Sequence, residues 1–242
     1  MREQILYYAW KYQGNWNKIA NAISKKEQWE IIQYDGNYIT IVDEHYPNCL
    51  KELNYAPWIL FYEGNLSYFQ EELVSVVGSR IMSSYGEKMC SLIVNQLKKK
   101  YVIVSGLAKG IDACAHRNAM DHKTIAVIGN GIDMTYPKEN DCLYENIKKN
   151  HLLISEYPNG TLPLNYHFPW RNRIIAALGS SLIVVEAKLK SGTMLSVNEA
   201  ITLDKPIYVV PYRYDDISGK GCNLLISQGA NILIDEMDLE NI

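Results

Sequence analysis

A buried, strand-like run that ends in glycine, serine and arginine is the first segment of the chain that could do chemistry. Residues 74–80 read VSVVGSR and precede a helix-length segment. Backbone N–H groups at a helix start attract anions, and Gly78 lets an anion approach them closely. Ser79 can donate a hydrogen bond, and Arg80 can hold a phosphate through two donors. The pattern predicts a phosphate site, with a tight turn and a surface ion pair of Arg80 as the alternative. Without G-x-G-x-x-G, no dinucleotide is specifically indicated.

A second loop of the same kind follows in the sequence IVSGLAKGIDACAH, where Lys109 lies between Gly106 and Gly110. Two such loops at one edge of a sheet strengthen the prediction of a phosphate site. Asp112 and His116 are four residues apart and therefore share one face of the helix that follows. We predict that they have a structural role at the site, capping the helix and fixing the loop. A catalytic acid–base pair is the alternative.

The segment YHFPWRNRII, residues 166–175, alternates aromatic rings with basic side chains. Single-stranded nucleic acids suit this pairing, because bases stack on aromatic rings at roughly 1–3 kcal/mol each while arginines hold phosphates. Phe168 and Trp170 are the candidate stacking residues, and anchoring of a loop in the core is the alternative for them. The phosphate candidates are Arg171, Asn172 and Arg173. On a helix the two arginines would not face the same way, so we expect one to contact the ligand and the other a carboxylate.

A third anion-binding loop is predicted after the run LIVVE, residues 182–186. Lys188 and Lys190 precede a candidate anion nest at a helix start, made of Ser191, Gly192 and Thr193. Glu186 would repel a phosphate, so we expect it to hold loop backbone or an arginine instead. Residues 129–137 also contain glycines but no charged donor, and we interpret them as a turn.

These loops need a sheet that brings the ends of several strands together. Short apolar runs rich in β-branched residues predict buried strands at 74–77, 102–104, 124–128, 152–154, 182–185, 207–210 and 231–234. Helix-length segments lie between them. This alternation predicts an α/β fold, an extended Rossmann-like domain with a mainly parallel, doubly wound sheet. Such sheets bind ligands at the carboxyl ends of their strands, where the loops above fall.

The clearest helix is predicted over residues 82–98. Its apolar stripe would contain Met82, Tyr85, Met89, Leu92, Ile93 and Leu97. We expect Ser84 and Glu87 to form a capping box at its start. The lysines at 98–100 suit the negative end of the helix dipole.

The chain before residue 74 is predicted to differ from this alternating pattern. Residues 1–36 have apolar residues at three- and four-residue steps, which predicts a short helical N-terminal region. The turn-like sequence YDGN at 34–37 marks its boundary with a Rossmann-like domain over residues 37–242. Within that domain, residues 38–42 and 58–62 are predicted strands around a short helix.

The composition excludes several classes of protein. The 242 residues are 48% hydrophobic and 21% charged, and no run approaches the roughly 18 apolar residues of a membrane span. The N-terminus is too mixed for a signal peptide, so we expect a cytoplasmic protein without membrane contact. The five cysteines are never spaced C-x-x-C, which argues against disulfides and a metal site. The net charge of -3 confines any nucleic-acid contact to a local basic groove.

Taken in series, these motifs resemble those of the DprA/Smf family of DNA-processing proteins. The segments that carry the resemblance are GSR, SGLAKGIDACAH, TIAVIGNGIDMTYP, ISEYP, FPWRNRII, VVEA with SGT, and GCNLLISQGAN. Each is weak alone, but their order and spacing agree over residues 46–231. Residues 45–65 are similar to the family's lead-in to its extended Rossmann fold.

The resemblance implies a protein that binds and shields single-stranded DNA and helps to load the RecA recombinase, with no cofactor and no catalytic step. It also implies a homodimer formed through the Rossmann domain. By motif, residues 78–80 would form the phosphate pocket and residues 171–173 would lie beside it, whereas Lys109 falls at a position that varies in the family. The N-terminal region is shorter than is usual for the family. We expect no winged-helix domain after the Rossmann-like domain.

Two other functions share this loop chemistry. The LOG-type phosphoribohydrolases, which cleave nucleoside monophosphates, resemble G-G-x-G-T-x-x-E. Here Ser196 stands at the third position after Thr193, and the nearest glutamate is Glu199, so the catalytic carboxylate is out of register. A sensor domain that binds a small nucleotide is the other alternative, because a mononucleotide and a DNA phosphate need similar donors.

Overall fold

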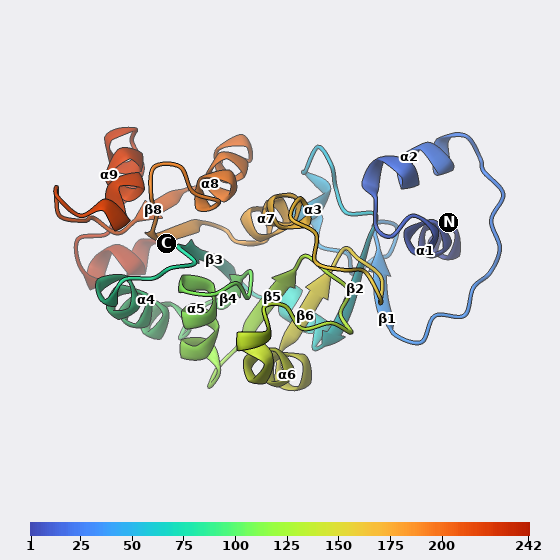
Figure 1. Cartoon of the computed structure of the whole chain (residues 1–242), viewed down its shortest axis with the longest axis horizontal. Coiled ribbons are helices and arrows are strands. Elements are labelled where there is room, and N and C mark those ends of the chain that lie inside the picture. Colours follow the sequence, from blue (N-terminus) through green and yellow to red (C-terminus); the bar gives the residue numbers. More distant parts are fainter.

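The computed structural model describes residues 1–242, apart from the side chain of Asn241. In this described chain, nine strands form one sheet in the order β1-β2-β6-β5-β4-β3-β7-β8-β9 (Figure 1). The strands are β1 (Asn37–Thr40), β2 (Ile59–Gly64), β3 (Leu73–Gly78), β4 (Val102–Ser105), β5 (Thr124–Ile128), β6 (Leu152–Ser155), β7 (Leu182–Glu186), β8 (Ile207–Val209) and β9 (Asn231–Ile232). Every predicted strand is present, with ends that differ by at most two residues.

The strands from β3 onward run parallel to one another, and β1 and β2 are antiparallel additions at one edge. Every residue of β4, β5 and β7 is buried. Parallel strands covered on both faces have this continuous apolar character, because neither face meets water. The predicted Rossmann-like, mainly parallel α/β fold is confirmed.

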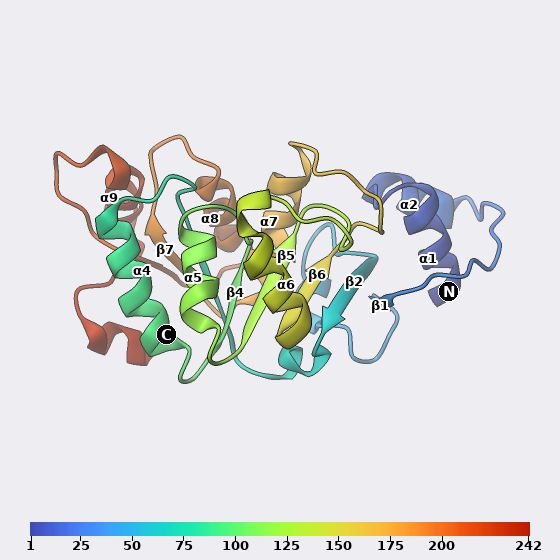
Figure 2. The same ribbon diagram turned by 60° about the horizontal axis from the view of Figure 1, so that its bottom comes forward.

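Helices cover both faces of the sheet (Figures 1 and 2). One face carries α4 (Ser84–Leu97), α5 (Ile111–Ala119) and α6 (Asp141–Asn150), and the other carries α7 (His167–Leu178), α8 (Thr193–Thr202) and α9 (Lys220–Ser227). Right-handed crossovers place helices on opposite faces when the chain moves in opposite directions along the sheet. The direction reverses between β3 and β7, so a crevice forms at the carboxyl ends of these two strands.

Helix α4 begins with a different cap from the one predicted. Its N-cap is Ser83, whose hydroxyl accepts the N–H of Gly86 at 3.0 Å. The predicted capping box of Ser84 and Glu87 is therefore wrong. Ser83 and Ser84 are adjacent at the start of the helix, and the sequence alone does not show which of them is the cap. The choice follows from a long-range contact, because Ser83 also donates its backbone N–H to Glu186 at the end of β7.

The buried face of α4 also differs from the predicted apolar stripe. Leu92 is 49% exposed, although the stripe included it. The buried residues are Gly86, Cys90, Ile93, Val94 and Leu97. At the start of this face the helix packs closely against the end of β7, which requires a glycine. A Cβ on Gly86 would stand 2.4 Å from a carboxylate oxygen of Glu186.

The N-terminal region contains two helices, α1 (Arg2–Lys11) and α2 (Trp16–Ser24), as its apolar periodicity predicts. Both helices lie beyond the β1 edge of the sheet (Figure 1). Their buried residues Ile5, Leu6 and Ile19 belong to a hydrophobic cluster that includes Phe61 of β2 and Tyr144 of α6. The short helix α3 (Asn48–Lys51) connects β1 to β2 along the chain. The N-terminal helices therefore share a core with the sheet domain.

Within the described residues, no helix combines the length and the apolar character needed to cross a bilayer. The five cysteines are all unbonded thiols. No group of three or more His, Cys, Asp or Glu side chains in the described chain is placed to hold a metal ion.

Candidate functional site

A cavity of about 400 Å³ lies at the carboxyl ends of β3 and β7, where the crossovers reverse direction. We call this cavity the crevice. Open α/β sheets bind ligands at this kind of switch point. The predicted site residues that line it are Gly78, Ser79, Arg80, Asp112, Phe168, Arg171, Asn172, Ser191, Gly192 and Thr193. Three predicted loops and the first turn of α7 therefore meet at one place.

The loops after β3 and β4 are locked together by backbone contacts. The N–H of Ile111, at the start of α5, donates to the carbonyl oxygen of Ser79 at 3.1 Å. Gly110 precedes it with φ at +74°, and a Cβ there would lie 2.1 Å from the same carbonyl oxygen. Only glycine fits this conformation and this close approach. The second glycine loop thus fixes the position of the first.

Arg80 is an exposed cation of the crevice. Within the described residues it has no ion pair and no hydrogen bond, and its guanidinium lies 5.4 Å from the ring centre of Phe168. The predicted alternative, a surface ion pair of Arg80, is absent from the described chain. The hydroxyl of Ser79 donates to the carbonyl of Ile81 at 2.7 Å and accepts its N–H at 3.1 Å. Ser79 therefore uses its side chain to shape the turn, contrary to the expectation that the hydroxyl is a free donor.

Arg171 forms the inner wall of the crevice and is 3% exposed. Its Nη1 donates to the carbonyl oxygens of Gly106, at 2.6 Å, and Val127. Burial lowers the pKa of Arg171 to about 10, while the nearby carboxylate of Asp112 raises it. Burial raises the pKa of Asp112 above its ordinary value, and Arg171 opposes that shift. At neutral pH Arg171 remains a cation whose field reaches the crevice.

Asp112 fixes the second loop, as predicted, in concert with this arginine. A Cβ on Gly106 would lie 2.3 Å from Nη1 of Arg171 and 2.6 Å from Oδ2 of Asp112. Any side chain at position 106 would therefore push the loop away from Arg171 and Asp112. The predicted partner of Asp112, His116, does not line the crevice. His116 is fully buried against Thr124 of β5, at 2.7 Å between Nδ1 and Oγ1, which disfavours the alternative of a catalytic acid–base pair with Asp112 at the crevice.

Two buried polar atoms at the crevice have no hydrogen-bond partner within the described residues. They are Nε of Arg171 and Oγ of Ser191. Buried donors are rarely left unpaired, because each costs about 1–3 kcal/mol. Both belong to residues that line the same cavity from opposite walls. Both atoms are themselves covered by protein, so they do not on their own indicate a bound ligand.

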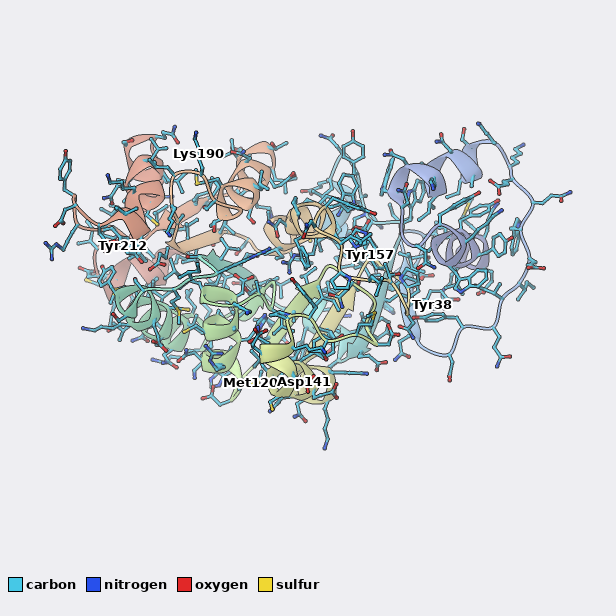
Figure 3. All side chains as sticks on the ribbon, viewed as in Figure 1. Tyr38, Met120, Asp141, Tyr157, Lys190 and Tyr212 are labelled. Atoms are coloured by element: carbon cyan, nitrogen blue, oxygen red, sulfur yellow. The ribbon has the colours of Figure 1, made fainter. Side chains whose placement is uncertain are left out.

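The loop between β7 and α8 forms the second wall and carries an exposed lysine. Lys188 lines the crevice, whereas Lys190 lies further along the same loop (Figure 3). Glu186 is fully buried and points away from this wall: it accepts hydrogen bonds from Ser83 and, at 3.1 Å, from the hydroxyl of Tyr212. Glu186 thus holds loop backbone, as predicted.

The first turn of α7 brings an aromatic ring to the crevice. Phe168 stacks on Tyr136, with ring centres 5.3 Å apart and planes at 26°. These two rings, together with Lys109, line a smaller adjoining cavity of about 80 Å³. The ammonium of Lys109 forms an exposed ion pair with Glu139. Lys109 therefore lies beside the crevice, and residues 129–137, interpreted as a plain turn, contribute a ring to the site.

Arg173 and Trp170, both candidates for ligand contact, lie outside the crevice, whereas Arg171 and Asn172 line it. Arg173 forms a bidentate ion pair with Glu156, at 2.8 and 2.6 Å, and both side chains are 4% exposed. Its guanidinium also lies 4.3 Å from the ring centre of Trp170, which packs on Tyr55. Residues two positions apart on a helix point in different directions. Arg171 therefore reaches the crevice and Arg173 reaches a carboxylate, as the spacing predicted.

The order of these motifs can be compared with known families. The sequence profile of the family described as DNA recombination-mediator protein A matches residues 37–241. The chain belongs to the DNA recombination-mediator protein A family. The predicted DprA/Smf resemblance is thereby confirmed.

Several members of the DNA recombination-mediator protein A family are similar over most of this chain. DNA processing protein DprA of Streptococcus pneumoniae is 44% identical over 202 residues, which are 83% of this chain and 72% of that protein. Protein Smf of Escherichia coli is 38% identical over 216 residues, which are 87% of this chain and 58% of that protein. The chain therefore matches only part of these longer relatives.

Two solved structures of the family share the fold. The X-ray structure of DprA from Streptococcus pneumoniae has a TM-score of 0.84 at 36% identity and covers 100% of this chain and 93% of that one. A DNA processing protein A from Helicobacter pylori, described with a single-stranded DNA binding mode, has a TM-score of 0.79 at 30% identity. That match covers 87% of this chain and 97% of the other.

Several residues that line the crevice are not predicted by the sequence motifs. Asn165, Ser196 and Ile81 line it, and Tyr136 reaches its edge. Ile81 directly follows the predicted loop GSR, but an apolar side chain gives no signal for phosphate binding. Ser196 follows Thr193 by three positions on α8, so the helical spacing could have placed it on the same face. The other three depend on how the loops fold over one another.

Proposed function

We propose that this protein binds single-stranded DNA in the crevice, and that this binding underlies its role as a DNA-processing recombination mediator. The observation that carries the proposal is Arg80, an exposed guanidinium without a protein anion, held over Phe168 at the rim of a cavity. A cation for phosphate beside a ring for a base is the combination that single strands need. The family relative from Helicobacter pylori, described as binding single-stranded DNA, supports it.

The charge and size of the crevice favour a nucleotide unit of a single strand. Arg80, Arg171 and Lys188 are its basic residues, and Asp112 is its one carboxylate among the described residues. Asp112 lies next to Arg171, so the other two cations are left for the ligand. A volume of about 400 Å³ lies in the range of small-ligand pockets, about 300–1,000 Å³, and would hold part of one strand at a time.

We infer that the crevice acts by binding and without a catalytic step. A phosphoribohydrolase would need a carboxylate free to act on the ligand. Glu199 lines a different cavity, together with Tyr55 and Trp170. Asp112 is buried beside a cation and fixes a loop. The arrangement of these carboxylates supports the binding function and disfavours the enzyme alternative.

Titration with a fluorescently labelled oligo-dT tests the proposal directly. We expect binding whose affinity falls with salt, because phosphate contacts release counterions. Hydrolysis of AMP, measured with the same protein, should remain at the rate of a blank. No oligonucleotide binding below about 10 µM at moderate salt would contradict the proposal, since even non-specific binding reaches roughly 1–100 µM. Binding of AMP that excludes oligo-dT would favour the alternative of a small-nucleotide sensor.

We propose further that two copies associate through the free edge of β9. Within the described residues this strand pairs only with β8. Its last residue, Ile232, is 38% exposed, and Ile234, two positions beyond the strand, is 75% exposed. Exposed apolar edge strands readily pair with another chain. Light scattering should give a dimer at micromolar concentration, and Ile234→Glu should shift it toward monomer. Wild-type protein that is monomeric under these conditions would contradict a homodimer.

The mediator role extends the proposal to the RecA recombinase. The family description and the proposed single-strand binding together support a protein that delivers covered DNA to a recombinase. We expect the protein to speed assembly of RecA on single strands that are already coated with single-strand binding protein. Assembly rates that do not change with added protein would contradict this role and leave strand binding intact.

A further inference from the structure

A second cavity, of about 680 Å³, opens between the turn joining α1 and α2 and the loop that leads from β6 to α7. We call it the groove. Its lining from the N-terminal side includes Lys11, Tyr12, Trp16 and Lys18, and from the sheet domain Tyr157, Tyr166 and Trp170. Figure 3 labels Tyr157 between α7 and the N-terminal helices. None of the motifs that identify the crevice includes the N-terminal half of this lining.

The walls of the groove are held together by direct contacts across it. Gly14, in the turn between α1 and α2, has φ at +70°, and a Cβ there would lie 2.8 Å from the ring of Tyr157. The hydroxyl of Thr161 donates to the side-chain oxygen of Gln13 at 3.0 Å. The ring of Trp16 donates its N–H to the carbonyl of Ala56 at 2.7 Å. The groove is therefore a built feature of the fold.

The charges at the groove favour an anion. No aspartate or glutamate lines it among the described residues. Lys11 pairs with Glu27, but the side chain of Lys18 has no ion pair or hydrogen bond within the described chain, and Lys18 is exposed. Residues 1–30 contain five Lys or Arg and three Asp or Glu, although the whole protein has a net charge of -3. The N-terminal region is thus locally basic.

The apolar lining of the groove is aromatic and partly accessible. Tyr166 is 65% exposed at the N-cap of α7, where its side chain makes no capping hydrogen bond. Trp170 and Trp16 are partly exposed, and Tyr157 stacks on His167 at 3.9 Å between ring centres. Flat rings that are held by packing can take stacked bases at little entropic cost.

The groove and the crevice meet at the first turn of α7. Phe168 faces the crevice, whereas Tyr166 and Trp170, two residues before and after it, face the groove. A strand held at Arg80 and Phe168 would have to cross this turn to reach the groove. At a rise of about 1.5 Å per residue, Phe168 is displaced by only about 3 Å along the helix axis from each of Tyr166 and Trp170.

From this continuity we propose that the groove is a second binding segment for the same DNA strand, in which Tyr166 stacks a base and Lys18 holds a phosphate. The inference rests on the proposed function of the crevice and deepens it. It gives the N-terminal helices a part in DNA binding and predicts a longer footprint than the crevice alone. The apolar rim at Leu162 and Leu164 would contact bases or sugars along the way.

Affinity measured against oligonucleotide length tests this inference. Oligo-dT of about 5 and about 20 nucleotides would be titrated by anisotropy, spanning the range of known strand footprints. Wild-type protein should bind the long strand more tightly. The variant Lys18→Glu/Tyr166→Ala should bind the short strand like wild type and the long one about fivefold or more weakly, the loss expected for one stacked base.

Two controls isolate the chemistry. Tyr166→Phe keeps the ring and should bind the long strand like wild type. Lys149→Glu makes the same charge change on an exposed lysine of α6, away from the groove, and should also bind like wild type. Thermal unfolding of each variant shows whether the fold is kept, and Lys18→Glu alone provides a second variant in case the double one is unstable.

The outcomes separate the two proposals. If wild type binds neither strand, or if Arg80→Ala changes nothing, the function proposed for the crevice fails and the inference fails with it. If Arg80→Ala weakens binding but Lys18→Glu/Tyr166→Ala binds the long strand like wild type, the crevice function stands and the groove inference is overturned. The aromatic lining would then belong to a protein partner.

Discussion

Two regions around helix α7 hold arginines, and they use them in opposite ways. On the crevice side, Arg80 is exposed and has no protein anion, while Arg171 behind it is held by backbone carbonyls. On the other side, Arg173 is paired with Glu156 in the core. The same residue type, even within the single sequence RNR, therefore serves ligand binding or folding. Burial and the nearest carboxylate decide which role each arginine has.

Arg173→Ala should give the largest effect in the comparison. It would leave the buried carboxylate of Glu156 without its partner, which typically costs about 3–5 kcal/mol of unfolding free energy. Urea denaturation measures this loss. If the Arg173→Ala variant unfolds like wild type, the ion pair with Glu156 does not stabilise the core. A loss of DNA affinity with unchanged stability would place Arg173 in the binding site instead.

Arg80→Ala should have the complementary effect, a loss of affinity without a loss of stability. A hydrogen-bonded charge contact contributes about 1.5–3 kcal/mol, so affinity for oligo-dT should fall roughly 10- to 150-fold. Arg117, exposed on α5 and absent from the crevice lining, offers a matched control. Arg117→Ala should bind like wild type, and equal losses for both variants would point to a non-specific charge effect.

Acid should destabilise the core beneath the crevice through a buried histidine. Burial lowers the pKa of His116 to about 3, with further lowering from His151 and Arg171. Because the folded value lies below the unfolded value of about 6.5, this stability is complete above pH 6.5 and declines as pH falls toward 3. At pH 5 the loss should be about 2 kcal/mol. Urea unfolding at pH 7 and pH 5 measures it, and His116→Gln should show a smaller decline; an equal decline would contradict the assignment.

Phe168→Ala should weaken binding by less than Arg80→Ala. Its ring is already stacked on Tyr136 on one side, so we expect a loss near the lower end of the range for a stacked base, about 1 kcal/mol. Phe168→Tyr keeps the ring and should restore affinity. Failure of Phe168→Tyr to do so would mean that the ring packs within the protein and does not touch the strand.

Lys188→Ala should give the smallest change, visible mainly in the salt dependence. Loss of one phosphate contact reduces the slope of log affinity against log salt by about 0.7 for a single strand. The affinity at low salt should fall slightly. An unchanged slope would place Lys188 with the solvated lysines of the loop and outside the site.

Much of the fold follows from the sequence because short apolar runs and glycine-bearing strand ends are local signals. The bounds of β5 match the predicted strand, and the loops at Gly78, Gly110 and Gly192 meet as expected. What depends on tertiary packing could not be predicted. Ser83 is the cap of α4 because Glu186 reaches it from another strand.

The site shows the same division between local and long-range information. The sequence indicates that one arginine of RNR contacts a carboxylate, but which one depends on where Glu156 lies in space. Tyr136 enters the site because its loop folds over α7, a contact between segments about thirty residues apart. The groove combines residues 11–18 with residues from 157 to 170, and no local sequence pattern joins these two segments.

The most direct test of the central claim is photocrosslinking of an oligo-dT that carries 5-iodouracil, followed by identification of the modified peptides. The ring of 5-iodouracil reacts with aromatic side chains against which it stacks. We predict modification of Phe168 or Tyr136, at the rim of the crevice, and a strong decrease in Arg80→Ala. Modification confined to peptides outside the crevice, undiminished in Arg80→Ala, would contradict the account.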